Sequence, residues 1–159
     1  MSNTGLPKSN LPDDFEQLEF SVEEENWNEY DLGDGTTIKA RILLKRISKD
    51  PNKPKDLIFD LVPPIFAVYT QSANRGERNN EPHPSESNGL PTFEVKITRS
   101  DEKMNLYRIL KTGQLLRIKL SVAKISRATG RFDKDGMPYY LVNSGPMVVV
   151  DNPDKKETQ

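Results

Sequence analysis

The chain of 159 residues contains no cysteine, and it has one histidine and one tryptophan. Without cysteine it forms neither disulfides nor thiolate metal sites. The single histidine, His83, stands between two prolines in a polar stretch, where no fixed partner is expected, so we assign it no acid or base role. No nucleophile elbow, phosphate-binding glycine loop or metal-ligand spacing is present. These absences predict a protein that is not an enzyme and that has no cofactor and no metal site.

Long hydrophobic runs are also missing. No stretch approaches the roughly 18 consecutive apolar residues of a membrane helix. The first residues contain no apolar run of the kind that a signal peptide has. We therefore expect a soluble, cytoplasmic protein that does not associate with membranes.

Hydrophobic residues make up 34% of the chain, below the roughly 45–50% of an average globular domain. The shortfall is concentrated in three polar segments, residues 1–14, 71–91 and 152–159. Such segments cannot bury enough apolar surface to offset the entropy lost on ordering. We expect a disordered tail at each end and a flexible linker at 71–91. They would flank two β units, formed by residues 15–70 and 92–151.

Each unit contains a version of the same phrase. The first is WNEYDLGDGTTIKARILLKRIS, from Trp27 to Ser48, and the second is MNLYRILKTGQLLRIKLSVAKIS, from Met104 to Ser126. With one extra residue at Thr112, identical residues align at Asn28/Asn105, Tyr30/Tyr107, Gly35/Gly113, Ile47/Ile125 and Ser48/Ser126. An internal duplication explains this similarity, but two amphipathic strands of any β protein also look alike. Repeated units of this size often lack a complete core of their own.

Alternation within the phrases predicts β-strands. In TIKARILLK and in QLLRIKLSV, apolar and polar residues alternate with the period of two that a half-buried strand requires. Asp34-Gly35 and the stretch FDKDGMP, residues 132–138, suit hairpin turns. Pro63-Pro64 and Gly145-Pro146 precede the last strand of each unit, and we expect them to break the strand or turn a corner. The segment SDEKMNLYRILK has some helical spacing, but we favour a strand there as well.

The predicted fold is therefore all-β. It consists of two related small five-stranded, barrel-like units, which either pack together or merge into one barrel or sandwich. Each unit alone would have a marginal core, which favours close packing of the two.

Basic residues gather on the predicted long strand of each unit. A charged outer face is the simplest explanation, but a basic stripe also suits an anionic partner. Tyr139 and Tyr140 are adjacent on a predicted strand, so one of them should face outward. The candidate binding residues are Lys39, Arg41, Lys45, Arg117, Lys119, Tyr139 and Tyr140.

Two functions fit this pattern. The first is a non-enzymatic interaction module, a subunit of a larger assembly, that presents its basic strand faces to an acidic protein partner. The alternative is binding of single-stranded DNA or RNA, with tyrosine stacking on bases. The isoelectric point of about 5.9 favours the first, because dedicated nucleic-acid-binding domains usually have values above about 9. The sequence leaves the oligomeric state open.

Overall fold

The computed structural model describes residues 15–53, 55–78 and 91–152. These residues form ten β-strands and one short 3-10 helix, η1 (Ser72–Asn74), and they include no α-helix. The strands make two five-stranded sheets that pack together. The all-β prediction is confirmed, and among the described strands no closed barrel forms. The expected tails, most of the expected linker and His83 lie outside the described residues.

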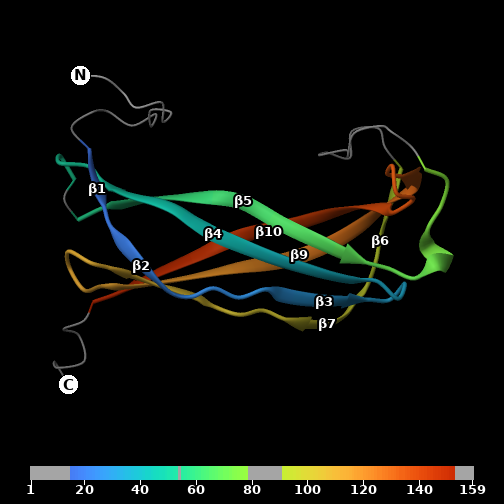
Figure 1. Ribbon diagram of the computed structural model, residues 1–159, viewed down its shortest axis with the longest axis horizontal. Coiled ribbons are helices and arrows are strands. Elements are labelled where there is room, and N and C mark those ends of the chain that lie inside the picture. The colour runs from blue at the N-terminus through green and yellow to red at the C-terminus, as the bar shows by residue number, and fades with distance from the viewer. Residues whose placement is uncertain (1–14, 54, 79–90, 153–159) are drawn as a thin grey trace.

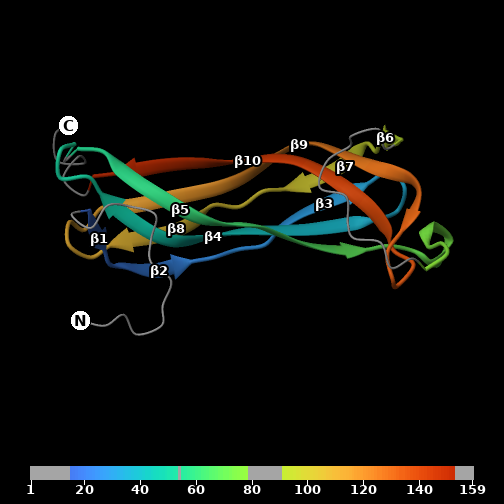
Figure 2. The ribbon, with the colours of Figure 1, turned by 90° about the horizontal axis from the view of Figure 1, so that it is seen from above.

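The strands divide into sheet A and sheet B. Sheet A contains β1 (Glu16–Leu18), β3 (Asn28–Leu32), β4 (Thr37–Lys49), β5 (Leu57–Tyr69) and β7 (Ile97–Asp101). Sheet B contains β2 (Phe20–Glu24), β6 (Thr92–Glu94), β8 (Asn105–Ile109), β9 (Leu115–Phe132) and β10 (Pro138–Asp151). The antiparallel hairpins β4–β5 and β9–β10 run along the length of an elongated molecule (Figures 1 and 2).

Each half of the chain contributes one strand to the sheet that is formed mainly by the other half. β2 belongs to the first half of the chain but pairs with β8 of the second half, whereas β7 of the second half pairs with β3 of the first. The strands that precede β2 and β7 pair within their own half of the chain: β1 pairs with β4, and β6 pairs with β9. Each sheet therefore has five strands, as expected for each unit, but these come from both halves of the chain.

The expected break at the prolines is wrong, although the register of the β4–β5 ladder shifts between Arg41 and Leu43, opposite Pro63-Pro64. β5 continues through Pro63-Pro64, and β10 continues through Pro146, which lies opposite Leu120 of β9. Among the described strands, β5 pairs only with β4 and β10 only with β9, so both are edge strands. An edge strand tolerates proline because the missing N–H can face away from the ladder. Register shifts in both hairpins accommodate the bending that the long strands need.

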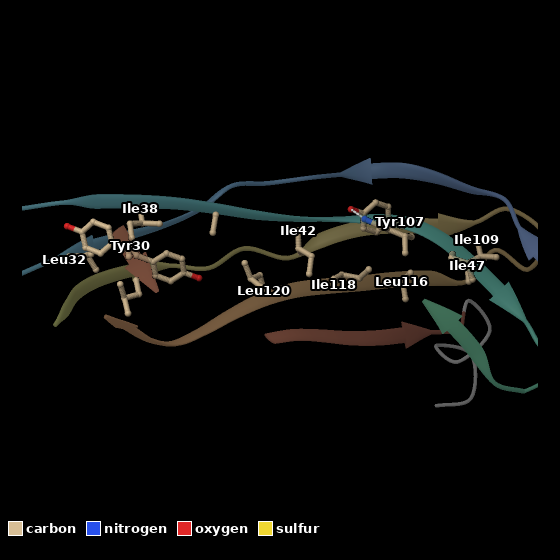
Figure 3. Packing of buried hydrophobic residues seen from close by; sticks show 14 of the residues in the cluster. Tyr30, Leu32, Ile38, Ile42, Ile47, Tyr107, Ile109, Leu116, Ile118 and Leu120 are labelled. Atoms are coloured by element: carbon tan, nitrogen blue, oxygen red, sulfur yellow. Dashed lines mark hydrogen bonds between the residues drawn. The ribbon is translucent and has the colours of Figure 1, made fainter. Parts of the chain in front are cut away.

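The core lies between the sheets and follows the predicted alternation. Ile38, Ala40, Ile42 and Leu44 of β4 are buried, as are Leu116, Ile118 and Leu120 of β9. Tyr30 and Tyr107 lie toward opposite ends of this core, with Ile42 and Leu120 between them (Figure 3). The corresponding positions in the two phrases thus contribute corresponding parts of one shared core.

The turns lie at the two ends of the molecule. The β3–β4 turn contains Gly35 at φ +85°, and the β8–β9 turn contains Gly113 at φ +74°. Glycine is favoured at both because a side chain is strained in this left-handed region. The turn predicted at 132–138 is also present, closed by a hydrogen bond from the Asp133 N–H to the Met137 carbonyl. The β3–β4 and β9–β10 turns share one end, and the β4–β5 and β8–β9 turns share the other (Figure 1).

The first part of the expected linker is attached to the fold. Asn74 in η1 donates from its side-chain amide to the Asp34 carbonyl at 2.7 Å. The Gly76 N–H donates to the Gly136 carbonyl in the β9–β10 turn. A Cβ at Gly76 would stand 2.3 Å from the Phe132 ring, which explains why glycine fits there.

Candidate functional site

Two buried asparagines position the strands that carry the candidate residues. The Asn28 side-chain amide donates to the Leu120 carbonyl at 2.9 Å, and its oxygen accepts from the Lys103 N–H at 2.8 Å. Asn105 makes the equivalent bonds from sheet B: its side-chain amide donates to the Ile42 carbonyl of sheet A at 2.6 Å, and its oxygen accepts from the Asn26 N–H at 2.8 Å. The aligned asparagines therefore link the two sheets reciprocally.

Two tyrosine–glutamate pairs accompany the asparagines. The Tyr30 hydroxyl donates to Glu102 at 2.8 Å, and the Tyr107 hydroxyl donates to Glu25 at 2.7 Å. Burial, followed by the carboxylate partner, raises the pKa of Tyr107 to about 12 and raises that of Tyr30 well above its usual value. Both tyrosines stay protonated at neutral pH and act as hydrogen-bond donors. They form part of the frame and are not available as reactive groups.

The predicted basic residues of sheet A face outward, and two of them lie beside carboxylates. Lys39 pairs with Glu29 at 4.0 Å, and Arg41 pairs with Glu25 at 3.3 Å. Lys45 is exposed, and among the described residues no carboxylate lies within 4.0 Å of it. The expected basic stripe on this sheet is therefore largely neutralised.

The basic residues of sheet B are arranged in the same way. Arg117 pairs with Asp151 at 2.9 Å, and Lys119 pairs with Glu102 at 3.8 Å. Asp151 lies on β10 and Glu102 follows β7, so neither acid is close in sequence to the base with which it pairs. The charge pattern along the chain could not reveal them, because only the tertiary structure brings the partners together.

Large apolar side chains lie among the bases on the outer side of sheet A. Trp27 is 40% exposed, and the Arg41 guanidinium lies 5.1 Å from its ring centroid. Tyr69 is 56% exposed, and the Lys39 ammonium lies 5.6 Å from its ring centroid. Ile65, opposite Arg41 in the β4–β5 ladder, is 41% exposed. We call these five residues the sheet A face: Trp27, Lys39, Arg41, Ile65 and Tyr69.

Sequence reasoning missed Ile65 and Tyr69 as candidate surface residues. The sequence contains only a weak indication of them: residues of β5 that pair with the outward-facing bases of β4 lie on the same face of the sheet as those bases. The pairing register that makes this visible follows from the bulges in the β4–β5 hairpin, and these were not predictable from composition.

Tyr139 and Tyr140 are both buried, so the prediction that one of them faces solvent is wrong. A register shift between Pro138 and Tyr140 interrupts the simple alternation of β10. Both tyrosines line a groove of about 570 Å³ between β5 and β10, together with Phe66, Val68 and Leu141. They cannot serve as an exposed stacking platform in this arrangement.

The Tyr140 hydroxyl belongs to a polar cluster at one end of the molecule. It donates to the Asp34 carboxylate at 2.7 Å, and Arg127 lies 3.2 Å from the same carboxylate oxygen. Burial alone would raise the pKa of Asp34, but the hydrogen bonds from Tyr140, Thr36 and Arg127 outweigh it and hold this pKa below its usual value. The cluster is internally satisfied and leaves Asp34 ionised at neutral pH.

Neither a metal site nor a membrane helix is found in the part of the chain that the structure describes. Within residues 15–53, 55–78 and 91–152, no group of three or more histidine, aspartate or glutamate side chains could hold a metal ion. No helix in these ranges has the length and apolar character needed to span a bilayer. No protein-family model, no curated protein and no solved structure gives a significant match to this chain.

Proposed function

We propose that this chain is a non-enzymatic protein-interaction module and that the sheet A face is its contact surface. The observation that carries this proposal is the gathering of exposed Trp27, Tyr69 and Ile65 around Arg41 and Lys39 on one side of one sheet. Tryptophan, tyrosine and arginine are the residue types that most often dominate the energy of protein–protein contacts. Arg41 and Tyr69 lie on paired strands and Trp27 directly precedes β3, and a surface held in place in this way loses less conformational entropy on binding.

The charges on this side favour a protein partner. Arg41 and Lys39 each have a carboxylate within 4.0 Å, so the surface is not strongly positive. Such a surface attracts polyphosphate chains weakly, since their binding depends on unneutralised lysine and arginine. A partner with an apolar centre and carboxylates at its edge would cover Trp27 and Tyr69 and also interact with Arg41 and Lys45.

Single-strand binding remains the second candidate because of one feature of the same surface. Each exposed ring of the sheet A face lies beside a cation, Trp27 beside Arg41 and Tyr69 beside Lys39. Bases stack on aromatic rings in this setting, and each stacked base contributes about 1–3 kcal/mol. The two candidates use the same residues and differ in their ligand.

We also infer that the chain arose by internal duplication, which places two related units in one molecule. The support lies in matched contacts: Asn28 and Asn105, Tyr30 and Tyr107, and the exchanged strands β2 and β7 occupy corresponding places. A unit of this kind would pair with a second copy of itself before duplication. After the duplication, each half would accumulate its own mutations, so the two ends of the molecule and the outer faces of the two sheets would come to differ.

Photo-crosslinking in cells tests the proposed surface. A benzophenone amino acid is placed at Tyr69, and in a control at Asn143, an exposed residue of β10. We expect a discrete protein adduct from position 69, and we expect unlabelled wild-type protein to suppress it. The triple variant Trp27→Ala, Ile65→Ala, Tyr69→Ala should not suppress it. Equal adducts from both positions, or none from position 69, would contradict the proposal.

A fluorescence titration with labelled single-stranded oligonucleotides separates the alternative. Binding at low salt that disappears in the triple variant would support the nucleic-acid candidate. The slope of log K against log salt would then be roughly −0.7 for each neutralised phosphate. Under the proposed function, wild type and triple variant show the same weak response.

A further inference from the structure

The two ends of the molecule correspond, residue by residue, in their turns. Asp34 precedes Gly35, and its carboxylate accepts from the Thr36 N–H at 3.1 Å. Thr112 precedes Gly113, and its hydroxyl accepts from the Gln114 N–H at 3.2 Å. Thr112 therefore occupies, at one end, the place that Asp34 occupies at the other, and the extra residue of the second phrase falls before Thr112, at Leu110 or Lys111.

The strand registers extend this correspondence to the neighbouring residues. Ser48 and Ser126 are aligned, so Lys49 on β4 corresponds to Arg127 on β9, and both lie opposite a short strand, β1 and β6 respectively. Tyr69 lies opposite Thr37, and Asp151 opposite Leu115, so the next residues, Thr70 and Asn152, also correspond. The two ends thus have the following pairs: Asp34/Thr112, Thr36/Gln114, Thr70/Asn152 and Arg127/Lys49.

At the end of the molecule with the β3–β4 turn, the basic residue Arg127 has a counter-ion within the fold. Arg127 and Asp34 form an ion pair at 3.2 Å whose side chains are only 15% and 16% exposed. The Thr36 hydroxyl bridges Thr70 and Tyr140, which completes the cluster. A carboxylate therefore fits among these side-chain types and neutralises the base between the strands.

At the second end the carboxylate is replaced by Thr112, and a cavity of about 360 Å³ is present. Lys49, Thr112, Gln114 and Asn152 line it with Lys55 and Lys111, and Leu18 and Leu57 provide apolar walls. We call this space the Lys49 cavity. Four of its polar lining residues, Lys49, Thr112, Gln114 and Asn152, are the counterparts of residues in the Asp34 cluster, without the acid.

The lysines that line the Lys49 cavity outnumber the carboxylates that form ion pairs with them. Glu16 lies opposite Lys49 in the β1–β4 ladder, and its carboxylate is bonded to Lys111 at 2.6 Å. Within the described ranges, neither Lys49 nor Lys55 has a carboxylate within the 4.0 Å of an ion pair. Of the three lysines that line the cavity, Lys111 has an ion-pair partner, and Lys49 and Lys55 have none in these ranges.

From this comparison we infer that the Lys49 cavity binds a carboxylate group from an acidic segment of a partner protein. The carboxylate takes the place that Asp34 has at the other end. The lysine ammonium groups and the amides of Gln114 and Asn152 act as donors to it, as charge-assisted hydrogen bonds require. The Lys49 cavity shares no residue with the sheet A face, so this inference stands or fails independently of the proposed function.

Nuclear magnetic resonance on the isotope-labelled full chain tests the site directly. The probe is the blocked peptide acetyl-Gly-Glu-Gly-amide, and its matched control is acetyl-Gly-Gln-Gly-amide. We expect saturable shifts of the Gln114 and Asn152 side-chain amides with the glutamate peptide and none with the control. A single carboxylate should bind with a Kd on the order of 1 mM. Equal shifts with both peptides would overturn the assignment.

Substitutions at Thr112 and Lys49 give a test that does not depend on loss of folding. Thr112→Asp supplies the missing carboxylate from within the chain, so it should weaken peptide binding at least about tenfold by occupying the site. The near-isosteric Thr112→Asn should leave binding within about twofold, and Lys49→Gln should weaken it several-fold. Unchanged binding in the Thr112→Asp variant, or equal loss in the Thr112→Asn variant, would overturn the charge argument.

Inorganic phosphate provides the last arm of the experiment. At equal concentration we expect smaller shifts of Gln114 and Asn152 with phosphate than with the glutamate peptide. Shifts with phosphate and none with the peptide would show that the cavity is a phosphate site and would overturn the carboxylate assignment.

Discussion

The side-chain amide of Asn28 donates to the main-chain carbonyl of Leu120, 92 positions further along the chain and in the other sheet. Leu120 lies where the edge of β9 has no strand partner, between the residues that pair with β8 and those that pair with β6. Asn105 reaches the carbonyl of Ile42, which lies in the matching gap of β4 between β3 and β1. Each asparagine therefore supplies a hydrogen bond that a neighbouring strand would otherwise provide.

Replacing either asparagine by alanine should destabilise the whole molecule. Asn28→Ala leaves the Leu120 carbonyl and the Lys103 N–H without these bonds, and each unsatisfied buried group costs about 1–3 kcal/mol. Asn105→Ala should have a loss of similar size, because its contacts are equivalent. Urea unfolding measures both. The control Asn143→Ala, at an exposed position, should stay within about 0.5 kcal/mol of wild type.

Much of the architecture was predictable from local pattern. The alternation in TIKARILLK places Ile38 and Ile42 in the core, and the repeated phrase places Tyr30 and Tyr107 in equivalent positions. Asp34-Gly35 marks a turn, as composition indicated. These features depend on residues close in sequence, whose effect on backbone conformation and face is local.

The features that failed prediction depend on contacts between distant segments. Alternation shows that residues 20–24 form a strand, but it does not say that β2 pairs with β8 of the other half. Proline in β5 indicates a break only if the strand has neighbours on both sides, and β5 is an edge strand. The acids that neutralise Arg41 and Lys119 were likewise invisible, because folding brings them there.

The strand exchange predicts that the two halves of the chain depend on each other. We expect residues 15–78 and 91–152, produced as separate chains, to lack cooperative unfolding when alone. Without its partner, β3 loses β7, β8 loses β2, and the shared core is cut in half. Mixing the halves should restore a cooperative thermal transition. Circular dichroism of each half and of the mixture provides the measurement.

Variants of the interlocking contacts give the control for this experiment. Asn28→Ala in the first half should weaken association, whereas Asn143→Ala in the second should leave it unchanged. Cooperative unfolding of either half alone would contradict the dependence of one half on the other.

Alkaline pH should destabilise the protein because three tyrosines hold their protons tightly. Burial raises the pKa of Tyr107 and Tyr140 to about 12, and burial beside Glu102 raises that of Tyr30. The unfolded value is 10.0, so this stabilisation is complete below about pH 10 and is lost as the pH rises toward 12. Tyrosinate absorbance should show late ionisation of these residues. Tyr107→Phe should reduce the loss of stability between pH 10 and 12.

The Asp34–Arg127 pair predicts an opposite dependence in acid. Hydrogen bonds hold the pKa of Asp34 below 3.8, so its stabilisation is complete above about pH 4 and is lost as the pH falls through the folded-state value. Asp34→Asn leaves the largely buried Arg127 uncompensated, and unfolding at neutral pH should show a loss of up to about 3 kcal/mol. The control is Asp31→Asn, which removes the exposed pair with Arg99 and should cost less than about 1 kcal/mol. Equal effects of the two substitutions in urea unfolding would show that burial of the Asp34 pair does not contribute. The wild-type protein should lose its advantage over the Asp34→Asn variant as the pH falls below 3.8 and through the folded-state pKa of Asp34, because the protonated Asp34 then also lacks the negative charge.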